Sequence, residues 1–333
     1  MHIFSTATLL VAGIGLMGGA TQAIGQQKVI NATGVAVSFM PSRAAVEKGF
    51  FKAEGLDVEV KLVRGGNDVI QALAGGNIEF GEASSAQFIS AVAGNLPIVA
   101  IGINSHGYLG KLIAAQRHAH LTKLADFKGK RIGVQVGTGA HTVFLMALQK
   151  SGLKAADFTI SNVRVNDMPA AIQSDEIDAF LAWDPMAVRM VQSGRGKEVI
   201  SAPQFEEIAG ITYPFLILTT EKIIRERPEL VQKYLNAFAK GQHAVDTQRA
   251  EALGIYRRTL PAQAVASMSD EDVRSQIYDV SKFDRVLPNS ADLNDLKQTS
   301  EFMLREKVIK AIPDLNKVIN LEFARKATVV LGK

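Results

Sequence analysis

The sequence predicts an α/β fold made of two similar lobes. Stretches typical of β-strands alternate with stretches typical of short helices, and the connections are short enough for parallel strand–helix–strand units. The pattern of the first such unit recurs about a hundred residues later. The chain has 333 residues, of which 47% are hydrophobic, so it can bury a core large enough for two domains.

The clearest local pattern is a strand that ends in a glycine turn and leads into a helix. Residues 131–136 have the alternation and β-branching of a strand. Gly137-Thr138-Gly139 can turn tightly because glycine has no Cβ, and apolar residues recur at helical spacing from Ala140. The first amides of a helix have no partner within it, so this turn can hold an anion or a polar head group.

The N-terminus predicts export. Residues 1–27 contain no Lys, Arg, Asp or Glu, and an apolar run ends in Thr21-Gln22-Ala23, which places small residues at −3 and −1 of a cleavage point. This is typical of a secretory signal peptide covering residues 1–23, although its n-region carries only His2. The chain has no cysteine, which excludes disulfides, thiolate metal sites, a Cys nucleophile and a lipid-anchored cleavage point. We therefore expect a soluble periplasmic protein, cleaved near Ala23.

The mature chain opens with a strand–helix–strand–helix–strand unit. Ser42 and Asn67-Asp68 are candidate caps for its two helices. The expected strands are 28–37, 56–63 and 78–81, and the expected helices are 42–48 and 69–74.

A second unit matches the first at an offset of 99 residues. The matching pairs are Asn67-Asp68 with Asn166-Asp167, Ile78-Glu79 with Ile177-Asp178, and Ser84-Ser85 with Trp183-Asp184. Either the chain contains two related lobes, or the likeness is a coincidence of shared hydrophobic patterns. If the lobes face each other, their ligand lies beyond the carboxyl ends of the parallel strands. Those ends are Ser38–Ser42, Arg64–Asp68, Ala83–Ser85, Gly137–His141, Asn166–Met168 and Ala182–Asp184.

Two further strands are expected to connect the lobes, at 111–116 and 211–220. The predicted organisation is lobe 1 at 28–110, lobe 2 at 111–212, and a return to lobe 1 with C-terminal helices at 213–333. These helices are expected at 228–244, 251–259, 270–280 and 290–310, the third with a capping box at Ser269.

Four stretches together resemble a known family. They are MPSRAAVEKGFFKAEGLDVEV, GGNDVIQALAGGNIEFGEASSAQF, LADFKGKRIGVQVGTGAH and IQSDEIDAFLAWDPMA. In this order they resemble the nitrate/sulfonate/taurine-type periplasmic substrate-binding proteins of ABC importers, a family that includes binders of thiamine-pyrimidine precursors. The resemblance implies a type II periplasmic-binding fold with two α/β lobes, a ligand cleft, two crossover strands and a helical C-terminal tail. It also implies an inner-membrane ABC permease as partner.

Several residues are candidates for binding a small-molecule ligand. Hydroxyls and turn amides suit an oxyanion, carboxylates would suit an amine, and aromatic side chains would form apolar walls. Each also has a structural alternative, such as a helix cap for Ser84, Asp167 and Asp184, core packing for Trp183, or a solvated loop for Arg64. The candidates are Ser38, Phe39, Met40, Arg64, Ser84, Ser85, Gly137, Thr138, His141, Asp167, Trp183, Asp184 and Tyr213.

Other functions fit the sequence less well. The net charge of +4, with acids and bases interspersed, offers no basic stripe for nucleic acid. Gly137-Thr138-Gly139 begins a dinucleotide motif, but Thr142 stands where the third glycine belongs. His118 and His120 lack further metal ligands nearby. We therefore expect a monomeric, non-enzymatic receptor with no cofactor or metal. A pyrimidine-related enzyme and a sensory binding protein stay open as alternatives.

Overall fold

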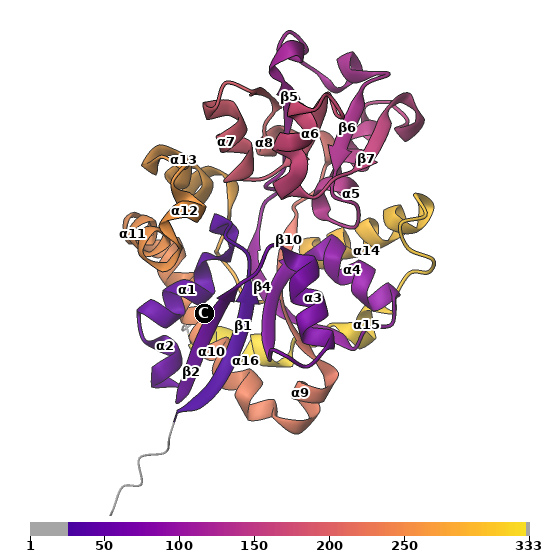
Figure 1. Ribbon diagram of the computed structural model, residues 1–333. Coiled ribbons are helices and arrows are strands. Elements are labelled where there is room, and N and C mark those ends of the chain that lie inside the picture. Colours follow the sequence, from indigo (N-terminus) through magenta and orange to yellow (C-terminus); the bar gives the residue numbers. More distant parts are fainter. Residues whose placement is uncertain (1–25, 331–333) are drawn as a thin grey trace, which may run out of the picture.

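The computed structural model describes residues 26–330, and these form two five-stranded mixed sheets with helices around them (Figure 1). The predicted signal peptide lies outside the described residues. Within them, no helix is both long enough and apolar enough to cross a bilayer.

The two sheets have the same strand order, as the internal repeat predicts. The orders are β2-β1-β3-β10-β4 and β7-β6-β8-β5-β9, so that β6, β7, β8, β5 and β9 take the places of β1, β2, β3, β10 and β4. In each, four strands run in the same direction, and the fourth position is taken by a connecting strand that runs antiparallel to both neighbours. The first sheet contains β1 (Gln27–Thr33), β2 (Leu56–Leu62), β3 (Phe80–Ser84), β4 (Ile98–His106) and β10 (Pro214–Thr220). The second contains β5 (Lys111–Ala115), β6 (Arg131–Val134), β7 (Thr159–Asn162), β8 (Ala179–Ala182) and β9 (Gly196–Ile200).

Short helices follow the strands of both sheets. Those of the first sheet are α1 (Met40–Glu47), α2 (Phe50–Ala53), α3 (Gly66–Ala74) and α4 (Ser85–Ala93). Those of the second are α5 (Gly139–Lys150), α6 (Met168–Gln173), α7 (Met186–Gln192) and α8 (Ala202–Ala209).

The C-terminal third is helical and packs mainly on the first sheet. Helix α10 lies against α1, and its Tyr234 stacks on Phe80 of β3 with ring centroids 3.7 Å apart. The segments α11–α13 and α14 also reach the second lobe, on two sides of the molecule (Figure 1). The elements are α9 (Glu221–Glu226), α10 (Pro228–Thr247), α11 (Arg249–Thr259), α12 (Ala262–Val265), α13 (Asp270–Ser275), a π-helical segment (Gln276–Val280), α14 (Ser290–Arg305), α15 (Leu315–Val318) and α16 (Glu322–Val330).

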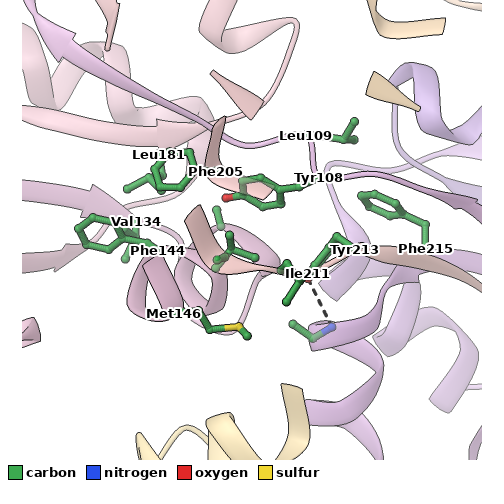
Figure 2. Close-up of a cluster of buried hydrophobic side chains, with 14 of the residues drawn as sticks. Tyr108, Leu109, Val134, Phe144, Met146, Leu181, Phe205, Ile211, Tyr213 and Phe215 are labelled. Atoms are coloured by element: carbon green, nitrogen blue, oxygen red, sulfur yellow. Dashed lines mark hydrogen bonds between the residues drawn. The ribbon is translucent and has the colours of Figure 1, made fainter. Parts of the chain in front are cut away.

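The two connections between the sheets lie side by side. The first runs from β4 to β5 and the second from α8 to β10, and the Gly107 amide donates to the Tyr213 carbonyl oxygen at 3.1 Å. The apolar core continues through this junction. Figure 2 shows Tyr108 and Tyr213 lying between Phe205 of the second lobe and Phe215 of the first.

Some predicted boundaries are wrong. Strand β1 ends at Thr33 instead of residue 37, because the chain turns at Val37–Phe39 and α1 begins at Met40, so Ser42 lies inside that helix and is no cap. Helix α3 begins at Gly66 after Gly65, so Asn67-Asp68 occupies its first turn. Helix α14 ends at Arg305 instead of residue 310. The capping box at Ser269 is confirmed.

Candidate functional site

A cavity lies between the two sheets, where the parallel strands β1, β2, β3, β6 and β8 end. It encloses about 620 Å³, including its open mouth. Five of the six predicted loops contribute to it, and only the loop at 166–168 does not. The lining residues are Gly34, Val35, Ala36, Phe39, Arg64, Gly65, Gly66, Ser84, Gln87, Tyr108, Leu109, Gly110, Thr138, Gly139, Ala140, Trp183, Tyr213 and Phe215.

Aromatic rings form much of the cavity wall. Phe39, Phe215, Tyr213 and Tyr108 make a continuous edge-to-face series, with neighbouring centroids 5.5–5.6 Å apart. The series continues outside the cavity to Phe205 at 5.8 Å. Trp183 belongs to the other lobe and is half-buried at the end of β8. Rings from both lobes therefore face the same space, which suits a ligand with a flat or apolar body.

The polar part of the cavity is built from the starts of three helices. Gly66 begins α3, Ser85 begins α4 and Gly139 begins α5, and residues at all three starts line the cavity. The first amides of each helix have no partner within it, and the helix dipole places partial positive charge there. The only charged side chain in the lining is Arg64, which is exposed at the mouth and pairs with Asp68 at 3.3 Å. The electrostatics therefore favour a negative or oxygen-rich group.

Tyr213 connects two of these helix starts. Its hydroxyl accepts a hydrogen bond from the Ala86 amide at 3.4 Å, at the start of α4. On the other side it lies against Gly139, where a Cβ would overlap the hydroxyl. Burial raises the pKa of Tyr213, so the phenol stays protonated at neutral pH. Glycine at position 139 is thus required for the close approach of the two lobes.

Two buried ionisable groups, Arg43 and Glu82, lie behind the wall. Arg43 of α1 is 2% exposed and donates hydrogen bonds to the carbonyl oxygens of Gly34 and Phe39, two residues of the cavity lining. Burial lowers the pKa of Arg43 to about 10, which still leaves it charged. Its charge faces Glu82, which is fully buried on β3 and accepts a hydrogen bond from Asn31 at 2.7 Å.

Six of the thirteen predicted ligand residues line the cavity, and seven do not. Ser38 and Met40 are fully buried beneath the first loop, and Ser85 is buried at the start of α4. His141 lies one turn into α5, where burial lowers its pKa. Those in the lining are Phe39, Arg64, Ser84, Thr138, Trp183 and Tyr213, and those outside it are Ser38, Met40, Ser85, Gly137, His141, Asp167 and Asp184.

The two acidic candidates lie away from the cavity lining. Asp167 is exposed and is the N-cap residue of α6, without a side-chain capping bond. Asp184 is buried behind Trp183, where it pairs with Lys111 at 3.1 Å and accepts from Gln276 at 2.8 Å. Burial raises its pKa, although Lys111 acts in the opposite direction. No carboxylate of the described residues therefore lines the cavity to receive an amine.

Seven lining side chains were absent from the predicted site: Val35, Ala36, Gln87, Tyr108, Leu109, Ala140 and Phe215. Tyr108 and Leu109 lie in the first connection between the sheets, and a sequence pattern of strands and helices says nothing of such a segment's side chains. Gln87 carried one usable signal. It stands three residues after Ser84, the spacing of a capping box, and this box is present.

Comparison with known proteins identifies relatives across most of the chain. A sequence model described as NMT1/THI5 like matches residues 36–252. A Brucella abortus protein that carries only a provisional binding-protein name is 29% identical over 57% of this chain and 58% of its own length. The Taurine-binding periplasmic protein of Escherichia coli is 27% identical over 67% of each chain. The chain thus spans 58% of the length of the first curated relatives that it matches.

Solved structures establish the type of fold. The alkanesulfonate-binding protein SsuA from Xanthomonas axonopodis, bound to MOPS, superposes with a TM-score of 0.73 at 18% identity. The match covers 88% of this chain and 98% of SsuA. The predicted type II periplasmic-binding fold, with two α/β lobes and a helical C-terminal tail, is therefore confirmed.

Proposed function

Because this chain belongs to the NMT1/THI5-like family, we propose that it is the periplasmic solute-binding receptor of an ABC importer. It would take up one small molecule between its two lobes and deliver it, unchanged, to an inner-membrane permease. The lobes would be residues 28–110 with 213–333, and residues 111–212. Hinge closure around a ligand is the usual motion of periplasmic binding proteins.

One observation carries the proposal: both lobes contribute to a single cavity that combines aromatic walls with three helix starts. A ligand in this cavity would contact Phe39 and Phe215 on one lobe and Trp183 on the other. Its binding energy would therefore favour the closed arrangement over an open one, which is the condition for ligand-driven closure.

The preferred ligand is an organic anion with an apolar or aromatic body. Helix-start amides are suited to sulfonate or carboxylate oxygens, and each hydrogen bond to a charged group contributes roughly 1.5–3 kcal/mol. The lining holds no carboxylate for an ammonium group, so a small aminosulfonate such as taurine is less favoured than an arylsulfonate or arylcarboxylate. A pyrimidine-type thiamine precursor is the alternative, since the same rings could stack on its heterocycle.

A panel of ligands tests the proposal on the purified protein. It should include arylsulfonates, arylcarboxylates, taurine, nitrate and an aminopyrimidine, each measured by thermal shift and by the fluorescence of Trp183, the single tryptophan. At a ligand concentration 100 times the Kd, binding should add about 2.7 kcal/mol to the free energy of unfolding. Absence of any shift across the panel, or conversion of a bound compound into a product, would refute the proposal.

A further inference from the structure

The capping box of α4 fixes the orientation of the Gln87 carboxamide. Gln87 Oε1 accepts hydrogen bonds from the Ser84 amide at 3.1 Å and from the Ser84 hydroxyl at 2.8 Å. In return, the backbone N–H of Gln87 donates a hydrogen bond to Ser84 Oγ at 3.4 Å. A backbone N–H can only donate, so the oxygen of the carboxamide must face Ser84 and the nitrogen must face away from it.

The amino group of Gln87 is therefore left without a protein partner. No atom of residues 26–330 accepts a hydrogen bond from Gln87 Nε2. The residue is only 8% exposed, and it lines the cavity. A ligand oxygen that reaches Nε2 can therefore accept a hydrogen bond from it without competing with a protein acceptor.

Gly66 makes room for this arrangement. It begins α3 beside the carboxamide, and a Cβ at this position would overlap the Gln87 side chain, most closely at Oε1. The absence of a side chain lets the start of α3, with its first amides, lie next to the Gln87 carboxamide. The start of α3 and the Gln87 carboxamide thus line the same part of the cavity.

We propose that Gln87 is a specificity-determining residue that donates Nε2 hydrogen bonds to the sulfonate or carboxylate of the ligand. This assignment rests on the proposed function, because it concerns the same cavity. It predicts selection for hydrogen-bond acceptors and against ammonium groups, since the carboxamide oxygen, the only acceptor of the Gln87 side chain, is held by Ser84.

Two substitutions separate this role from a purely structural one. Gln87→Glu keeps an oxygen acceptor for Ser84, and with it the capping box, but replaces the donor by a negative charge. Gln87→Met removes both the cap and the donor without adding charge. If Gln87 only caps the helix, Gln87→Met should weaken ligand binding more than Gln87→Glu does. If Gln87 donates to an anion, Gln87→Glu should weaken binding more. Gln204→Glu is a matched control, because Gln204 makes the same capping box with Ser201, at 2.8 Å and 3.0 Å, outside the cavity.

The experiment is calorimetric titration of the purified wild type and the three variants with naphthalene-2-sulfonate and phenylacetate. We expect Gln87→Met to raise the Kd roughly 10- to 150-fold, Gln87→Glu to raise it further, and Gln204→Glu to leave it unchanged. Wild-type affinity in both Gln87 variants, or weaker binding by the methionine variant than by the glutamate variant, would overturn the assignment and leave the proposed function intact. Failure of the wild type to bind either probe would instead count against the proposed function, and the assignment would fall with it.

Discussion

The Glu82 carboxyl should make the stability of the protein depend on pH between about 4.5 and 7. Burial raises the pKa of Glu82 from its ordinary value of 4.5 to about 7, and the charge of Arg43 offsets this only in part. The folded state therefore binds the proton more tightly than the unfolded chain does. The contribution of Glu82 to stability is therefore greatest below pH 4.5, falls as the pH rises, and levels off above 7. A difference of two and a half pKa units corresponds to a loss of about 3 kcal/mol.

Substitution of Glu82 by glutamine tests this expectation directly. Glutamine does not ionise, and its carboxamide oxygen can still accept from Asn31, as the carboxylate does. Urea unfolding should be measured for both proteins at several pH values between about 4.5 and 7.5. Across this range the wild type should lose about 3 kcal/mol more than the variant.

Other carboxyls that titrate in the same range affect both proteins equally and cancel in the difference. Glu59→Gln on strand β2 of the same sheet is the control, because Glu59 is exposed, and this variant should follow the wild type. If the wild-type and Glu82→Gln curves stayed parallel over the whole range, the argument from burial would be wrong.

Three further changes have expected outcomes. Trp183→Ala should weaken binding of an arylsulfonate roughly 10-fold in a calorimetric titration, through loss of an aromatic contact; unchanged affinity would remove Trp183 from the site. Asp178→Asn should lower the free energy of unfolding in urea by about 1–3 kcal/mol at neutral pH. Hydrogen bonds from Arg131 hold the Asp178 pKa below its usual range, so the difference should shrink as the pH falls below about 4, and a constant difference would contradict this. Gly139→Ala should weaken ligand binding because its Cβ would overlap the Tyr213 hydroxyl, and Tyr213→Phe in the same chain should restore part of the affinity; no rescue would disprove that contact.

The repeated architecture was predictable because it depends on local patterns. The glycine turn after β6 marks the start of α5 correctly, and the 99-residue offset anticipates the equal strand order of the two sheets. Both signals come from residues close together in sequence, where hydrophobic period and backbone freedom dominate.

The composition of the site was only partly predictable, because it depends on distant contacts. A loop sequence does not show whether a side chain is exposed or which residues it contacts. Asp184 was therefore a candidate for ligand binding, although Lys111 and Gln276 occupy its carboxylate oxygens. Gln87 is the opposite case, because its spacing from Ser84 indicates only a helix cap. Only the folded structure shows that Gln87 also lines the cavity.

The interrupted path of the chain through the first sheet has a consequence for biosynthesis. All strands of the second sheet lie in one uninterrupted stretch, from Lys111 to Ile200. The first sheet cannot be completed before β10 has been synthesised, because β10 lies between β3 and β4 and ends only at Thr220. As the polypeptide emerges from its N-terminus, the lobe that begins second is thus the first that can be completed. A fragment beginning near residue 111 and ending near residue 212 has every strand it needs, whereas residues 26–110 alone lack a central strand of their sheet.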